Sequence, residues 1–177
     1  MNTSKKIHRL VLSAVIAALY VAVTLTQEMI FPTSATMAVQ FRVSEALTVL
    51  SLFTPAAIPG LTVGCLIANF SVLGALPTDI FLGSLASLLA CMFMYRLRNV
   101  TVKGFPFVSL LMPALFNGII IGAEIEVFFI EGPFNFFSFL IQAGLVALGE
   151  LVVLYTLGAA LVKVIGKKHI GKYLNGV

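Results

Sequence analysis

The sequence has few charged residues, and this excludes a water-soluble fold. Charged residues make up 10% of its 177 residues, whereas hydrophobic residues make up 60% and the mean hydropathy is +1.09. So little polar surface cannot cover a soluble globule of this length. We therefore expect a single all-α integral membrane domain over residues 1–177.

Several sites that would indicate chemistry are also missing. Cys65 and Cys91 stand alone on separate apolar runs, without the spacing of zinc or redox pairs, so we expect them to pack and expect no metal or cofactor. No Gly-x-x-x-x-Gly-Lys-Ser/Thr loop is present, so the chain is not expected to hydrolyse nucleotides. Ser84 or Ser87 could be paired only with histidines that lie in basic clusters, which argues against an enzyme.

Positive charge is confined to a few short segments that predict the membrane topology. Ten of the eleven Lys and Arg residues fall in three groups: Lys5, Lys6 and Arg9; Arg96, Arg98 and Lys103; and Lys163, Lys167, Lys168 and Lys172. Positive residues that flank membrane spans stay on the cytoplasmic side. We therefore expect both termini to be cytoplasmic in a multi-pass protein of the cell membrane. Because the excess charge marks this face, nucleic acid is not predicted as a partner.

The apolar runs predict six membrane helices, since about 20 apolar residues cross a bilayer core. The stretch from 41 to 73 is too long for one span, and the two prolines and glycine of residues 54–60 divide it into two. Two helices there also give the even number of spans that places both basic ends on one side. The expected helices cover about 10–27, 41–53, 56–73, 79–95, 105–123 and 136–165.

The second of these helices is unusually short. As an α-helix, residues 42–53 would be about 18 Å long, so neighbours must bury it or residues 37–40 must extend it. Its shortness suggests a cavity at its outer end. The preceding external loop, Gln27 to Gln40, is long enough to form a lid, although a disordered loop is the alternative.

Polar residues gather on the side opposite the basic clusters. Ionised side chains are costly inside a bilayer and face a protein interior or water, so they indicate a functional site by default. Because the inner halves of the helices hold no comparable set, the pattern predicts a binding cup open to the exterior rather than a channel. The candidate ligand-binding residues are Gln40, Arg42, Glu45, Asn69, Asp79, Asn117, Glu124, Gln142 and Glu150.

Each candidate also has a purely structural interpretation. Arg42 and Glu45 are three residues apart and could form an ion pair that holds the helix end. Asp79 follows Pro77-Thr78 and could cap a helix. Glu124, Glu126 and Glu131 could be solvated loop acids, an interpretation that we favour for Glu131 and, less firmly, for Glu126. The buried amides and Glu150 could form hydrogen bonds between helices.

Small residues recur every four positions on the first helix. Ala14, Ala18 and Ala22 form a flat ridge that permits close approach of another helix. The ridge could serve packing within the chain or the docking of a partner subunit.

Several motifs together resemble the queuosine-precursor transporter family. They are Phe-Arg-Val-Ser-Glu-Ala-Leu at 41–47, Phe-Thr-Pro-Ala-Ala-Ile-Pro-Gly at 53–60, Gly-Cys-Leu-Ile-Ala-Asn at 64–69, and Asp79 followed by Gly-Ser-Leu-Ala at 83–86. The chain departs from the family pattern at Ser51, where proline is usual, and at Thr78, where an aromatic residue is expected. The resemblance covers most of the chain.

This resemblance implies a substrate-binding S component of an energy-coupling-factor transporter. Such a protein captures its ligand outside, works with a transmembrane coupling subunit and two cytoplasmic ATPases, and topples in the membrane to release the ligand. The alanine motif for the coupling subunit would correspond to Ala14 and Ala18, and the first external loop would act as a gate. The implied ligand is a 7-deazaguanine such as preQ1 or queuine, whose adjacent N–H donors suit Glu45. The alternatives are an S component for another vitamin-like molecule and a stand-alone carrier.

Overall fold

Helices make up nearly all of the structure. The computed structural model describes residues 3–32, 40–71 and 77–167, and within these ranges the one β interaction is an isolated bridge between Val102 and Phe105. The elements are α1 (Thr3–Ile30), η1 (Val43–Leu52), α2 (Ala57–Ser71), α3 (Pro77–Leu97), α4 (Phe107–Glu124), η2 (Ile125–Phe129), α5 (Phe136–Val153), η3 (Leu154–Gly158) and α6 (Ala159–Lys167). The predicted all-α class is confirmed.

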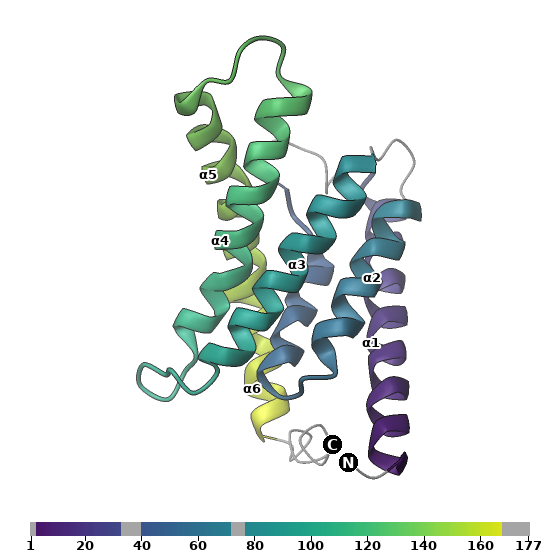
Figure 1. The fold of residues 1–177 in the computed structure, drawn as a ribbon. Coiled ribbons are helices and arrows are strands. Elements are labelled where there is room, and N and C mark those ends of the chain that lie inside the picture. Colours follow the sequence, from purple (N-terminus) through teal and green to yellow (C-terminus); the bar gives the residue numbers. More distant parts are fainter. Residues whose placement is uncertain (1–2, 33–39, 72–76, 168–177) are drawn as a thin grey trace.

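The helices run alternately up and down, as Figure 1 shows. The first turn of α1, the α3–α4 connection and the end of α6 therefore lie at one end of the bundle, which we call the basic end because it carries Arg9, Arg98 and Lys163. The α4–α5 connection and the start of α3 lie at the other end, which we call the acidic end. This arrangement agrees with the charge pattern of the sequence.

Four helical stretches are long and apolar enough to cross a membrane. They are Thr3–Ile30, Pro77–Leu97, Phe107–Phe129 and Phe136–Gly166. The other two apolar helices, Val43–Leu52 and Ala57–Ser71, have 10 and 15 residues and are shorter than a full span. The predictions of six spans and of cytoplasmic termini therefore stay predictions.

Helix α1 is longer at both ends than the predicted 10–27. No glycine or proline occurs before Pro32, so nothing interrupts its backbone hydrogen bonds, and the N–H of Phe31 still donates to Gln27 O at 2.7 Å. Gln27 therefore lies in the helix, and the expected loop from Gln27 to Gln40 is shorter than predicted. The predicted gate, and the possible extension of the second helix through 37–40, fall mostly on residues 33–39, which lie outside the described residues.

The predicted short α-helix at 41–53 is a 3₁₀-helix, η1. Its 10 residues cover about 20 Å at a rise of about 2.0 Å per residue, more than the same residues would cover as an α-helix. Side-chain hydroxyls support the three-residue repeat, because Thr48 Oγ1 donates to Glu45 O at 2.6 Å and Ser51 Oγ donates to Thr48 O. In a 3₁₀-helix, residues three apart lie above one another, so Glu45, Thr48 and Ser51 form one polar line, and all three are fully buried.

Helix η1 occupies the centre of the bundle. It contacts α1 to α6, and Figure 1 shows it passing between α3 and α6. Two apolar clusters surround it: one joins α1, α2 and Cys91 of α3, and the other joins η1, α3, α4 and Leu154. Cys65 and Cys91 are both buried and unpaired, as expected for packing residues.

The last two predicted helices continue through π-helical turns. The α4 helix extends through η2 to Phe129, beyond its predicted end at residue 123, and α5, η3 and α6 form one stretch from Phe136 to Lys167. The π turn η2 directly follows Glu124, and η3 begins four residues after Glu150. Such turns often occur beside functional residues, because they change the direction of the side chains around them.

Candidate binding site

Glu45 lies at the centre of a buried polar cluster. Its Oε1 accepts a hydrogen bond of 2.5 Å from the Tyr20 hydroxyl of α1 and one of 3.5 Å from Ser87 Oγ of α3. Its Oε2 is buried and has no hydrogen-bond partner among the described residues. The protein thus holds one oxygen of this carboxyl group, and the other forms no hydrogen bond within the described residues.

Arg42 stands directly before η1 and is the one cationic side chain that the described residues contribute to the cluster. No other Lys or Arg occurs between Arg9 and Arg96 in the sequence. Glu45, Glu150 and Glu124 all lie close enough to Arg42 for an electrostatic interaction. Its Nε is buried without a hydrogen-bond partner in the described part of the chain.

The simple ion-pair interpretation of Arg42 and Glu45 does not describe this geometry. Within the described residues, the hydrogen-bond partners of the Glu45 carboxylate are Tyr20 and Ser87, from two other helices. Gln27 holds the start of η1 instead: its amide nitrogen donates to Phe41 O, and its Oε1 accepts from the N–H of Val43 at 2.7 Å. These bonds fix the backbone on both sides of Arg42.

Asn69 joins α2 to the first turn of α3. Its Nδ2 donates to the Asp79 carbonyl oxygen at 3.0 Å and approaches Cys65 Sγ at 3.7 Å. This position depends on Gly83, because a Cβ there would lie 2.6 Å from Asn69 Nδ2 and 3.8 Å from Arg42 Nη1. Asp79 is in the first turn of α3 rather than at its N-cap, since the helix begins at Pro77. The missing side chain of Gly83 therefore lets Asn69 and Arg42 lie side by side.

Glu124 adds a third carboxyl group, at the end of α4. It is buried beside Thr78 and Asp79, and it interacts with the charges of Asp79 and Arg42. Neither of its oxygens has a hydrogen-bond partner of normal geometry among the described residues. It is not a solvated loop acid, because α4 and η2 keep it inside the helical bundle.

Glu150 of α5 repeats the arrangement of Glu45. Asn117 Nδ2 of α4 donates to its Oε1 at 3.2 Å, and its Oε2 is buried without a partner in the described residues. Both residues are buried, and the charge of Glu45 interacts with Glu150. The predicted bond between helices exists here, and it uses one of the two carboxylate oxygens.

The two glutamines of the candidate set have different surroundings. Gln40 is buried, and its backbone packs so tightly on α5 that a Cβ at Gly149 would lie 2.1 Å from Gln40 O. Gln142 is half-buried on α5, eight residues before Glu150. At 1.5 Å per residue it lies about 12 Å from Glu150 along the helix, so its link to the cluster stays a prediction.

Glu126 and Glu131, which follow Glu124 in the sequence, differ in their exposure to solvent. Glu126 is buried, not solvated, because the helix continues through η2, and its Oε1 accepts from the N–H of Asn135 at 2.9 Å. The Asn135 side chain in turn caps α5 by accepting from the N–H groups of Phe137 and Ser138. Glu131 is exposed, as predicted for a loop acid.

Sequence reasoning missed Tyr20 and Ser87, which both hydrogen-bond to Glu45. Tyr20 is fully buried on the face of α1 that packs against α2. A phenol in the middle of an apolar run needs a polar partner when it is buried, so its position is a usable signal. Ser87 offered no such signal, since a serine can satisfy itself within its helix, as Ser84 does by donating to Ile80 O at 2.6 Å.

The alanine ridge lies on the outer surface of α1. Ala14, Ala18 and Ala22 are all exposed, whereas Ala17 is buried. The close contact of α1 with α2 uses the other face, where a Cβ at Gly64 would lie 3.0 Å from Ala17 O. Packing within the described chain therefore does not use the ridge, and its role in docking stays a prediction.

The cluster offers hydrogen-bond acceptors from three sides and one cationic donor. Among the described residues of the cluster, the oxygens without a hydrogen-bond partner belong to Glu45 of η1, Glu124 of α4 and Glu150 of α5, and the donor is Arg42. No group of three His, Cys, Asp or Glu side chains in the described residues is arranged to hold a metal ion. A small organic molecule with several N–H donors, a carbonyl group and a positive charge would satisfy these atoms.

Comparison with known proteins agrees with a transport role. The family described as "QueT transporter" matches residues 10–167 of the chain. The protein named "Queuosine precursor transporter QueT" from Lactococcus lactis subsp. cremoris (strain MG1363) is 33% identical over 173 residues, which cover 92% of this chain and 95% of that protein. No solved structure matches the chain.

Proposed function

The chain belongs to the QueT transporter family, and from this premise we propose that it captures a queuosine precursor on the extracellular side as the S component of an energy-coupling-factor importer. It is a transporter and not an enzyme. The proposed ligand is a 7-deazaguanine, such as preQ1 or queuine. The proposed partners are a transmembrane coupling subunit and two cytoplasmic ATPases in the cell membrane.

The buried carboxyl groups with unpartnered oxygens carry the ligand proposal. Leaving such a group buried and unsatisfied costs about 1–3 kcal/mol, and more when it is charged, so a fold that keeps several of them together has a use for them. The guanine-like edge presents two adjacent N–H donors, which Glu45 Oε2 can accept. Arg42 Nε can donate to the base carbonyl.

An aminomethyl group on the ligand would occupy the other side of the cluster. In the described part of the chain, Glu150 Oε2 and both Glu124 oxygens are buried without a hydrogen bond of normal geometry, and carboxylates are the strongest acceptors for an ammonium group. Asn69, Asp79, Gln40, Asn117 and Gln142 would complete or support the hydrogen bonds. The cationic precursor should therefore bind more tightly than the neutral base.

The exposed alanine ridge supports the proposed coupling subunit. Ala14, Ala18 and Ala22 present small side chains along one outer face of α1, and larger side chains such as Val15 and Leu19 flank them. Small residues let two helix backbones approach closely within a membrane. The same helix carries Tyr20 on its inner face, so α1 joins the ligand cluster to the proposed docking surface.

Calorimetric titration of the purified chain tests the ligand. We expect preQ1 to bind at least about tenfold more tightly than uncharged 7-deazaguanine, because one charge-assisted hydrogen bond contributes about 1.5–3 kcal/mol. Tighter binding of an unrelated vitamin would refute the ligand. Uptake by cells that express the chain with and without the coupling module tests the mechanism, and accumulation without any ATPase would indicate a stand-alone carrier instead.

A further inference from the structure

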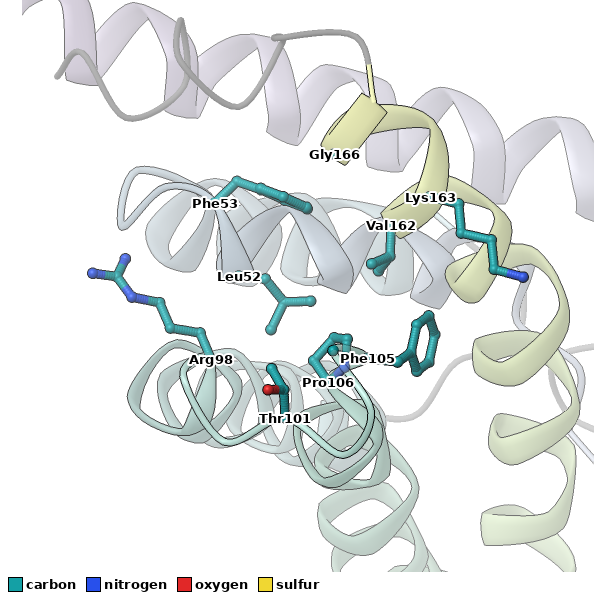
Figure 2. A pocket seen from close by; sticks show the side chains of 10 residues that line it. Leu52, Phe53, Arg98, Thr101, Phe105, Pro106, Val162, Lys163 and Gly166 are labelled. Atoms are coloured by element: carbon teal, nitrogen blue, oxygen red, sulfur yellow. The ribbon is translucent and has the colours of Figure 1, made fainter.

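A second candidate site lies at the basic end of the bundle, far from the carboxylate cluster. A groove of 390 Å³ opens between the end of η1, the α3–α4 connection and α6. Figure 2 shows the side chains that line it. Its chemistry differs from that of the substrate cluster, so the groove is not part of that site.

The groove combines an apolar floor with two cationic side chains. Leu52, Val162 and Pro106 lie between Arg98 on one side and Lys163 on the other, as Figure 2 shows. The Arg98 guanidinium is positioned by Tyr95, because its Cζ lies 4.1 Å from the centre of that ring. Phe53 and Phe105 also contribute to the lining.

No acidic side chain from the described residues lines the groove. The sequence also has no Asp or Glu between Asp79 and Glu124 or after Glu150. Arg96 and Lys103 lie close by in sequence, so this part of the chain is rich in positive charge. A site of this kind attracts anions, and its apolar floor favours an anion that carries hydrocarbon.

We propose that this groove binds an anionic phospholipid. In Figure 2 the charged ends of Arg98 and Lys163 point outward on opposite sides of the groove, so the phosphate group lies at the rim, within the positive potential of both side chains. The start of an acyl chain covers Leu52, Phe53 and Phe105. The position suits a lipid of the adjacent leaflet, because basic pockets between membrane helices bind anionic headgroups in this way. The inference is independent of the substrate proposal, since it uses neither the carboxylate cluster nor the alanine ridge.

Fluorescence quenching tests the inference directly, because the chain contains no tryptophan. Phe53→Trp places a single reporter in the groove, and Phe105→Trp is a second reporter in case the first variant does not fold. Phe81→Trp, at an exposed position of α3 near the acidic end, is the matched control. Each variant is reconstituted in phosphatidylcholine vesicles that contain a small fraction of acyl-brominated phosphatidylglycerol or acyl-brominated phosphatidylcholine.

We expect the groove reporter to be quenched preferentially by brominated phosphatidylglycerol. One Lys or Arg near an anionic lipid favours it by about fivefold, so two should give roughly a 30-fold preference at low salt. The control reporter should be quenched equally by both lipids. Equal quenching of the groove reporters by both lipids would overturn the inference. It would indicate instead that the groove binds an apolar segment of a partner protein.

Charge variants identify the residues responsible. In the Phe53→Trp background, replacing both Arg98 and Lys163 with glutamine should remove most of the preference. Replacing Lys5 and Lys6 with glutamine removes the same charge from the same end of the bundle and should leave the preference unchanged. An unchanged preference in the first variant, or relief of quenching by millimolar inorganic phosphate, would refute a lipid site at these residues.

Discussion

Replacing Glu45 with glutamine changes one carboxylate oxygen into an amide nitrogen and leaves the side-chain shape the same. In the wild-type protein, Oε1 accepts from Tyr20 and Ser87, and Oε2 is buried without a partner in the described residues. If the amide oxygen of the variant faces Tyr20, its NH₂ group faces the N–H donors of the ligand. If the amide turns over, Tyr20 loses its acceptor. Either orientation breaks one of the two sets of hydrogen bonds.

The size of the effect follows from the bonds that are lost. A hydrogen bond to a charged group contributes about 1.5–3 kcal/mol, which corresponds to a roughly tenfold to hundredfold loss of affinity. We expect the Kd of Glu45→Gln for preQ1 to rise within this range. Tyr20→Phe removes only the hydroxyl that holds Oε1 in place, so we expect a smaller rise of about threefold to tenfold.

Isothermal titration calorimetry in detergent measures both values. Glu126→Gln is the matched control, because it makes the same chemical change at a buried acid whose Oε1 accepts from the backbone N–H of Asn135 and whose Oε2, like that of Glu45, has no partner among the described residues. Its affinity for the ligand should remain that of the wild type. Thermal unfolding of each variant separates lost binding from lost structure. A folded Glu45→Gln protein with unchanged affinity would refute the assignment of Oε2 to the ligand.

Two further predictions concern the packing of the site and the outer face of α1. Gly83→Ala should weaken ligand binding at least about tenfold, because its Cβ would displace Asn69 Nδ2, which lies 2.6 Å from that position. Gly144→Ala has open space around its Cβ and should bind the ligand normally. Equal ligand affinities of the two variants in calorimetric titration would contradict the role of Gly83. Ala18→Leu should abolish uptake but preserve binding in detergent, because Ala18 is exposed on the ridge. Ala160→Leu, at an exposed position of α6, should transport normally, and normal uptake by Ala18→Leu would exclude the ridge as the docking surface.

The charge and hydropathy pattern was sufficient to predict the all-α class and to locate the polar residues. The basic segments lie together at one end of the bundle because each helix reverses direction at a loop whose position is visible in the sequence. The break at Pro55 to Gly60 separates η1 from α2 as expected. Hydrophobic periodicity and helix breakers are local properties of the chain, so they can be recognised without a structure.

Element ends and local helix types were harder to predict. The extension of α1 to Ile30 depends on the absence of a breaker before Pro32, which could have been recognised. The 3₁₀ geometry of η1 could not, because it reflects how a short segment is stretched and surrounded by six other helices. Tertiary contacts commonly override local propensity in this way.

The sequence by itself determined that this chain is a helical membrane protein with its carboxyl groups kept away from its basic segments. Only the tertiary structure decided which oxygens of Glu45 and Glu150 are held by Tyr20, Ser87 and Asn117 and which have no hydrogen bond within the described residues. It also decided that Ala17 packs inside while Ala18 is exposed. The physical reason is that hydropathy is a property of each residue, whereas satisfaction of a buried polar atom depends on partners that are distant in sequence.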